Sequence, residues 1–185
     1  MVEEVKKNSE EKMKKAITAL HSEFNTLRTG RASASLFDAI NVDYYGQKTP
    51  LSQVATISVP EARLVVIQPW DKSVLTGIEK AIQKSELSIN PNNDGKVIRI
   101  SIPPLTEERR KELVKLAKGK AEQSRVSIRN IRRDANEEFK ELQKASKISE
   151  DDSKRGMDDI QKLTDKYIEE IASILEQKEK EILEV

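Results

Sequence analysis

Cysteine is absent from this chain of 185 residues, and histidine occurs once, as His21. Without a thiol the chain forms no disulfide, and a single histidine cannot supply a zinc cluster or a Ser-His-Asp triad. His21 is therefore interpreted as a surface or seam residue of a helix. Aromatic residues make up only 4% of the chain, which argues against an RNA platform that stacks bases on aromatic rings. These absences predict a protein that is not an enzyme and that has no cofactor and no bound metal.

Long apolar runs are also missing, since none approaches the roughly 20 residues that a membrane-spanning helix needs. The first residues, 1–7, lack the apolar core of a secretory signal and are too acidic for a mitochondrial presequence. No glycine-rich phosphate loop is present, because the longest candidate, around Gly95, contains one glycine. We therefore expect a cytoplasmic protein that contacts no membrane.

Charged residues make up 35% of the chain, yet the formal net charge is only +1. The two signs are separated along the sequence. Residues 104–148 have thirteen basic and eight acidic side chains, a net charge of +5, whereas residues 149–185 have six and twelve, a net charge of −6. A basic helix beside an acidic one indicates a polarised molecule with an anionic partner on one side.

The basic part coincides with a long segment, Thr106 to about Ala145, that no proline interrupts. Its apolar and small residues recur at alternating steps of three and four until the last, which is typical of a helix buried along one seam. The predicted seam consists of Val114, Ala117, Ala121, Ser124, Ile128, Ile131, Ala135 and Leu142. At 1.5 Å per residue such a helix is roughly 60 Å long.

Arginines dominate another side of this predicted helix. From Arg109 to Arg133 there are ten basic residues against two acids, Glu112 and Glu122. At about 100° per residue the central arginines form a stripe roughly a quarter to a third of a turn from the apolar seam. This arginine stripe consists of Arg125, Arg129, Arg132 and Arg133. Because arginine suits bidentate contact with phosphate, the stripe indicates a nucleic-acid backbone as partner, with a merely solvated charged face as the alternative.

Two further segments, residues 3–28 and 149–183, have apolar seams of the same spacing. Gly30 is predicted to end the first helix as a left-handed residue, and Ser149 with Asp152 resembles a capping box at the start of the second. Three helices with one seam each satisfy one another as an antiparallel bundle. We therefore expect residues 1–30 and 104–185 to form an elongated three-helix bundle.

Between these helices the pattern changes to short β-branched runs separated by proline and turn residues. Strands are expected at residues 40–44, 54–59, 63–67 and 97–102. Ser73 is expected to cap a short helix that follows the third of them. Residues 31–103 thus form a small, β-rich α+β domain inserted into the bundle, and the fold class is α+β. The two connections are interpreted as a two-stranded hinge made of Thr29, Gly30, Arg31, Pro103, Pro104 and Leu105.

Six short motifs occur along the chain: Leu27-Arg28-Thr29-Gly30-Arg31-Ala32-Ser33, Asp43-Tyr44-Tyr45-Gly46, Thr49-Pro50-Leu51, Asn90-Pro91, Pro103-Pro104-Leu105-Thr106-Glu107-Glu108-Arg109-Arg110-Lys111 and Ile128-Arg129-Asn130-Ile131-Arg132-Arg133. In this order and in a chain of this size, they make the whole sequence resemble the bacterial ribosome recycling factor family. Two departures fall in the inserted domain, because Ala34 stands where many members have proline and Ser88 stands where glycine is common.

The resemblance implies a three-helix bundle and a small domain joined by a hinge, in a monomer that needs no cofactor. It implies binding to the post-termination ribosome, mainly through large-subunit ribosomal RNA, and separation of the subunits with elongation factor G and GTP. The family's RNA-contacting arginines correspond to Arg28, Arg129, Arg132 and Arg133, and more loosely to Arg110 and Arg125. A helical scaffold or chaperone-like protein with a solvated basic face is the alternative from another class.

Overall fold

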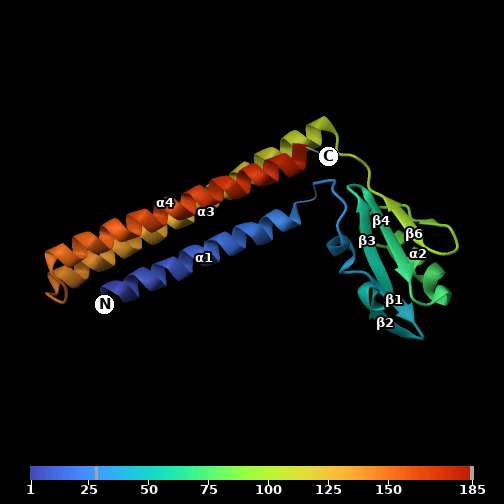
Figure 1. Ribbon diagram of the computed structural model, residues 1–185, viewed down its shortest axis with the longest axis horizontal. Helices are drawn as coiled ribbons and strands as arrows, with labels where there is room; N and C mark the ends of the chain where they lie inside the picture. Colours follow the sequence, from blue (N-terminus) through green and yellow to red (C-terminus); the bar gives the residue numbers. More distant parts are fainter. Residues whose placement is uncertain (28, 184–185) are drawn as a thin grey trace. The chain divides into compact units, whose positions relative to one another are not determined.

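A computed structural model describes residues 1–27 and 29–183 of the chain. The chain forms two compact units, each with its own secondary structure (Figure 1). The larger unit contains residues 1–27 and 107–183, and the smaller one contains residues 29–106. Within the described residues, no helix combines the length and the apolarity that crossing a bilayer requires. The larger unit is therefore assembled from two segments that lie far apart in the sequence.

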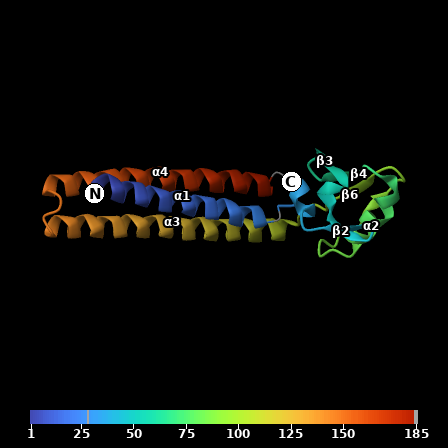
Figure 2. The same ribbon diagram turned by 90° about the horizontal axis from the view of Figure 1, so that it is seen from below.

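Three long helices form the larger unit: α1 (Val2–Thr26), α3 (Glu107–Lys144) and α4 (Glu150–Leu183). The helices lie side by side, with α3 and α4 as an antiparallel hairpin and α1 antiparallel to α3 but parallel to α4 (Figures 1 and 2). Ion pairs join α1 to both partners, because Lys6 Nζ lies 2.9 Å from Asp159 Oδ2 and Lys120 Nζ lies 3.1 Å from Glu23 Oε2. The predicted three-helix bundle is confirmed, although one of its pairs is parallel.

Burial in α3 follows the predicted seam from Ala117 to Ile128 and at Ala135 but differs from it at both ends. The buried positions are Leu113, Ala117, Ala121, Ser124, Ile128, Ala135 and Phe139. Leu113 is thus buried in place of Val114, and Phe139, which the predicted seam omits, is fully buried. The difference arises because steps of four outnumber steps of three, so that a strict alternation of three and four loses register.

The Phe139 ring packs against α4 at Gly156, a buried residue inside the helix. A Cβ atom at position 156 would lie 2.7 Å from Phe139 Cζ, closer than side-chain atoms pack. Glycine in a helix interior ordinarily costs about 1 kcal/mol relative to alanine. Here the missing side chain makes room for the ring, and Val5, Ala135 and Ile160 complete this end of the core.

The start of α4 is a capping box, as the sequence predicts. The Asp152 backbone N–H donates to Ser149 Oγ at 3.0 Å, and the Ser149 backbone N–H donates to Asp152 Oδ2 at 3.4 Å. Hydrogen bonds from the Ser149 side chain and backbone lower the pKa of the Asp152 carboxyl. Aspartate therefore performs the role that glutamate or glutamine usually has at this position.

The smaller unit contains a two-stranded sheet, a four-stranded sheet and the helix α2 (Leu75–Gln83). In the first sheet β1 (Asn41–Tyr44) pairs with β2 (Gln47–Pro50). The second is antiparallel in the order β3 (Ala55–Glu61), β4 (Leu64–Pro69), β6 (Ile98–Ser101), β5 (Asn92–Asn93). Ile78 and Ile82 of α2 are fully buried in one core with apolar side chains of β4 and β6. The predicted α+β class is confirmed.

Two local features of the smaller unit differ from the sequence-based expectation. Residues 47–50 form β2 rather than only a turn, because Tyr45 and Gly46, with φ of 50° and 78°, make the two-residue type I′ turn that suits a hairpin. The cap before α2 is Asp71 rather than Ser73. Asp71 Oδ1 accepts the Ser73 backbone N–H at 2.9 Å, at the start of a short 3₁₀ helix that leads into α2.

Ala34 and Ser88, the two departures from the family motifs, occupy positions with a conformational role. Ala34 is the first residue of a 3₁₀ helix, Ala34–Phe37, whose capping Ser33 Oγ accepts the Ser35 backbone N–H at 3.3 Å. Proline suits that position because its φ is already fixed at a helical value. Ser88 has φ of 51°, in the left-handed region where glycine is unstrained. Both turns form with the residues present.

Backbone hydrogen bonds anchor both connections within the smaller unit. The Ala32 N–H donates to the Ala62 carbonyl at 2.7 Å, and the Ile102 N–H donates to the Arg63 carbonyl at 2.8 Å. Both acceptors belong to the turn between β3 and β4. The chain thus enters and leaves the smaller unit beside the same turn.

Gly30 has φ of +73°, as predicted for a left-handed residue, and a Cβ atom there would lie 2.9 Å from Leu105 Cγ. It does not end α1, however, because Leu27 is the C-cap of that helix and has extended backbone. Gly30 therefore permits the close approach of the two connections rather than a helix stop. The assignment of residues 29–31 and 103–105 as a hinge stays a prediction.

Replacing residues 31–103 by a short Gly-Ser linker is expected to leave a helical protein that melts cooperatively. The two units have separate hydrophobic cores, and Gly30 and Leu105 are close enough for a short linker. Circular dichroism at 222 nm, followed during heating beside the intact chain, measures the transition. A broad, noncooperative loss of helix would contradict the independence of the bundle.

Candidate nucleic-acid interface

The arginine stripe lies along the central part of α3, beside the seam that packs against the other helices. Arg129 and Arg133 are exposed, whereas Arg125 and Arg132 are half-buried. The fold thus keeps all four arginines at least partly exposed, while Ile128 between them is fully buried in the core. The predicted stripe is a continuous feature of the helix surface.

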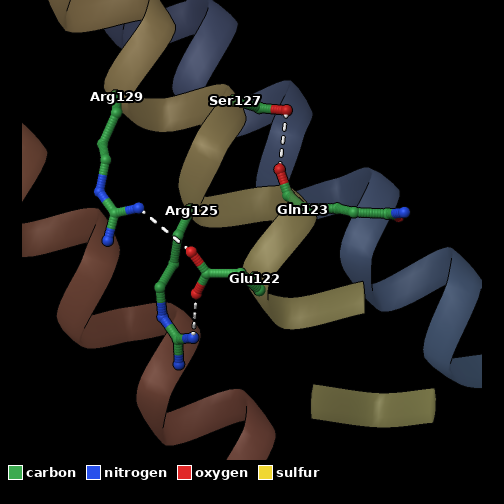
Figure 3. A network of polar contacts seen from close by, with 5 residues as sticks. All are labelled: Glu122, Gln123, Arg125, Ser127 and Arg129. Atoms are coloured by element: carbon green, nitrogen blue, oxygen red, sulfur yellow. Dashed lines mark hydrogen bonds and ion pairs between the residues drawn. The ribbon is translucent and has the colours of Figure 1, made fainter. Parts of the chain in front are cut away.

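Glu122 binds two arginines of the stripe at once (Figure 3). Arg125 Nη1 donates to Glu122 Oε2 at 2.9 Å, and Arg129 Nη1 donates to Glu122 Oε1 at 3.2 Å. The hydrogen bonds from Arg125 and then Arg129 lower the pKa of the Glu122 carboxyl, so it stays ionised at neutral pH. Two positive charges at this end of the stripe therefore share one negative charge.

Arg132 is oriented differently, by a neutral side chain of α4. Its Nη1 donates to Gln161 Oε1 at 3.0 Å, and Gln161 Nε2 donates to Asp165 Oδ1 at 2.8 Å. The second bond fixes the Gln161 amide so that its oxygen faces the guanidinium. An amide acceptor positions Arg132 without neutralising its charge.

A groove of about 380 Å³ between α3 and α4 surrounds Arg132. Its lining consists of Arg129, Asn130, Arg132, Arg133, Asn136, Glu137, Lys140 and Gln161. Among the described residues, no carboxylate lies within ion-pair distance of Arg132 or Arg133. The groove therefore contains two arginines, Arg132 and Arg133, that form no ion pair with a described carboxylate, although Glu137 also lines it.

The structure brings together only part of the predicted site. Arg129, Arg132 and Arg133 share the groove, and Arg125 lies one turn away along the same helix. Arg110 lies near the start of α3, roughly 22 Å from Arg125 at 1.5 Å per residue, and is half-buried. Arg28 lies outside the described residues. Arg110 is thus a separate location on α3 rather than a member of the groove.

Lys140, Asn136 and Gln161 belong to the groove but are absent from the predicted site. A signal for Lys140 was present, since it continues the stripe at helical spacing beyond Arg133. The sequence contains no signal for Gln161, because this residue belongs to another helix and its proximity to Arg132 depends on how α3 and α4 align. The groove offers bidentate and single-point donors at once, as contacts to successive phosphates of a nucleic-acid backbone require.

Comparisons with known proteins all lead to one family. The family model described as "Ribosome recycling factor" matches residues 20–183. The chain is 66% identical to the ribosome-recycling factor of Treponema denticola and 60% identical to that of Syntrophomonas wolfei, and each alignment covers 100% of both chains.

Solved structures agree with the sequence comparisons. A solution structure of the ribosome recycling factor is similar with a TM-score of 0.74 at 49% identity, covering 100% of this chain and 98% of that one. A second structure has a TM-score of 0.64 at 45% identity and covers 99% of both chains. That structure comprises models for the T. thermophilus ribosome recycling factor and the E. coli elongation factor G bound to the E. coli post-termination complex.

Proposed function

The chain belongs to the ribosome recycling factor family, and we propose on that premise that it binds the post-termination ribosome and, with elongation factor G and GTP, promotes its separation into subunits. Full-length similarity to a factor described on the post-termination complex supports this proposal. The family consists of translation factors without covalent chemistry of their own, so the chain is not an enzyme. The cytoplasmic location expected from the sequence agrees with this bacterial family.

The arginine stripe and its groove support large-subunit ribosomal RNA as the contact. The single observation that carries this assignment is the absence, among the described residues, of any carboxylate paired with Arg132 or Arg133. A solvated charged face usually contains ion pairs between neighbouring turns of the helix, and such pairs occur elsewhere on α3 and α4. Cations left without such partners in a groove are suited to bind phosphate.

A splitting assay tests the proposed function directly. Post-termination ribosomes are mixed with the chain, elongation factor G and GTP, and light scattering follows the fall in particle mass. We expect the fall only when all three components are present, and no fall when a nonhydrolysable GTP analogue replaces GTP. Splitting by elongation factor G alone at the same rate, or none with all components, would contradict the proposal.

We further propose that the two units reorient about residues 29–31 and 103–105 during this cycle. Motion between domains is the expected behaviour where few side chains join them. Because the chain has no cysteine, dyes can be attached to cysteines introduced at Lys144 and Lys84, one exposed position in each unit. Energy transfer between them should show a broad distribution, whereas a control pair at Lys144 and Glu176 inside the bundle should show a narrow one. Equally narrow distributions would contradict the hinge.

A further inference from the structure

Glu122 is the only acidic residue between Leu113 and Arg133, a stretch that contains seven basic residues. Its carboxylate is about half exposed, at 53%, and contacts Arg125 at 2.9 Å and Arg129 at 3.2 Å. Both partners lie on its own helix, three and seven residues further along, so these bonds do not join α3 to α1 or α4 (Figure 3). A role in holding the bundle together therefore does not explain this carboxylate.

We infer that Glu122 competes with RNA phosphates for Arg125 and Arg129 and thereby limits how tightly the arginine stripe holds RNA. The inference rests on the proposed function of the stripe and assigns a role within it to an acidic residue. A phosphate that binds either arginine must displace the carboxylate or share the guanidinium with it. The carboxylate also repels any phosphate that approaches its two partners, because both groups are negative.

The opposite role, in which Glu122 holds the two arginines ready for RNA, is less consistent with the surface around it. Arg132 in the same stripe is oriented by the amide of Gln161, which leaves the full charge of the guanidinium in place. Orientation in this surface therefore does not require a carboxylate. An exposed ion pair within one helix also contributes little rigidity, since water competes for both partners.

A limit on affinity suits a factor that acts repeatedly. Each cycle of binding requires release, and the release rate usually changes more than the association rate when contacts in one interface change. As phosphates leave, the Glu122 carboxylate can form its hydrogen bonds to Arg125 and Arg129 again, and this would favour dissociation of the chain from the RNA. Removing it should slow the departure of the chain from the ribosome.

The test measures binding of the full chain to isolated large ribosomal subunits across a salt series. Glu122→Gln should bind about three- to tenfold more tightly at the lowest salt, and its log-log salt dependence should steepen by about one unit, as the gain of one effective cation predicts. Glu112→Gln is the matched control, because Glu112 pairs with Arg109 at 2.8 Å on the same helix but outside the stripe. At about 0.1 M salt it should change affinity less than twofold, because salt at that concentration screens charges beyond about 10 Å.

A combined variant separates competition from general repulsion. When Arg125→Ala and Arg129→Ala are also present, Glu122→Gln should no longer raise affinity, because the carboxylate has lost both groups for which it competes. Melting curves of all variants confirm that the bundle stays folded. A gain that persists unchanged in the combined variant would overturn the inference, and so would weaker or unaltered binding by Glu122→Gln alone.

Arg132→Glu, measured in the same series, distinguishes the two levels of the proposal. If Arg132→Glu loses binding and Glu122→Gln does not gain it, the role of Glu122 is wrong while the arginine stripe remains the RNA contact. If Arg132→Glu binds as the unmodified chain does, the stripe is not the contact and both proposals fail.

Discussion

Arg132→Glu is expected to lose nearly all measurable affinity for the large ribosomal subunit while the bundle keeps its stability. Hydrogen bonds to charged groups contribute about 1.5–3 kcal/mol each, so Arg132→Ala alone should weaken binding by about 10- to 150-fold. Glutamate adds repulsion from phosphate, and the change of two charges should flatten the log-log salt dependence by about two units. Binding to isolated subunits at several salt concentrations measures both effects.

The fold gives a reason for the unchanged stability. Among the residues that the structure describes, the Arg132 side chain donates to Gln161 Oε1 at 3.0 Å, a surface contact between one half-exposed and one exposed side chain. Substitutions at such positions usually alter stability by less than about 0.5 kcal/mol. Lys162→Glu on α4 is the matched control, because Lys162 is 80% exposed and lies 3.9 Å from Asp159. Undiminished binding by Arg132→Glu would refute the assignment of the arginine stripe as the RNA contact. A loss of binding that is accounted for by unfolding of the variant would refute it as well.

Gly156→Leu is expected to destabilise the bundle by about 3 kcal/mol, at the upper end of the usual cost of overpacking a core. Even the Cβ atom would lie 2.7 Å from Phe139 Cζ, and the ring is fully buried among other core side chains. The improved helix propensity of leucine offsets less than about 1 kcal/mol of this cost. At about 2–4 °C per kcal/mol, the helical transition should fall by roughly 6–12 °C.

Gly119→Leu provides a control with the opposite sign. Gly119 also lies inside a helix, α3, but no atom lies within 4 Å of the position of its missing Cβ. Leucine there should therefore raise stability by about 0.5–1 kcal/mol through helix propensity alone. A further variant that combines Gly156→Leu with Phe139→Ala should recover part of the lost stability, because it moves apolar volume across the same contact. Equal effects at the two glycines would contradict this account of the core.

The sequence predicts what depends on the period of one helix and misses what depends on the alignment of two. Arg125, Arg129 and Arg132 share a side because 3.6 residues complete one turn whatever the neighbours are. Gln161 could not be placed beside Arg132, since 29 residues and a turn separate them. The sequence shows Glu122 as an isolated acidic residue, but its ion pairs with two arginines depend on side-chain rotamers, which the sequence does not give.

In the smaller unit, too, the sequence predicts elements with a regular apolar pattern and misses those that depend on the geometry of a neighbouring turn. Its long apolar strands were predicted from β-branched runs, but residues 47–50 have no alternating apolar pattern and form β2 because the turn at Tyr45 and Gly46 places them opposite β1. Asp71 replaces Ser73 as the cap because a 3₁₀ turn precedes α2, which moves the helical start upstream. Both differences depend on the backbone geometry of a local turn, which the apolar pattern of the sequence does not determine.

The buried seam of α3 has a consequence for how the helices wind. When half-buried Ile131 is counted with the buried residues, the seam advances 26 residues from Leu113 to Phe139 in seven steps, an average of about 3.7 residues, whereas a left-handed coiled coil requires 3.5. The spacing of the α3 seam therefore does not favour a left-handed supercoil, and the exposed face of α3 stays on one side of the bundle. The arginine stripe, which extends from Arg125 to Arg133 over roughly 12 Å of α3, therefore stays on one side of the bundle instead of winding around it.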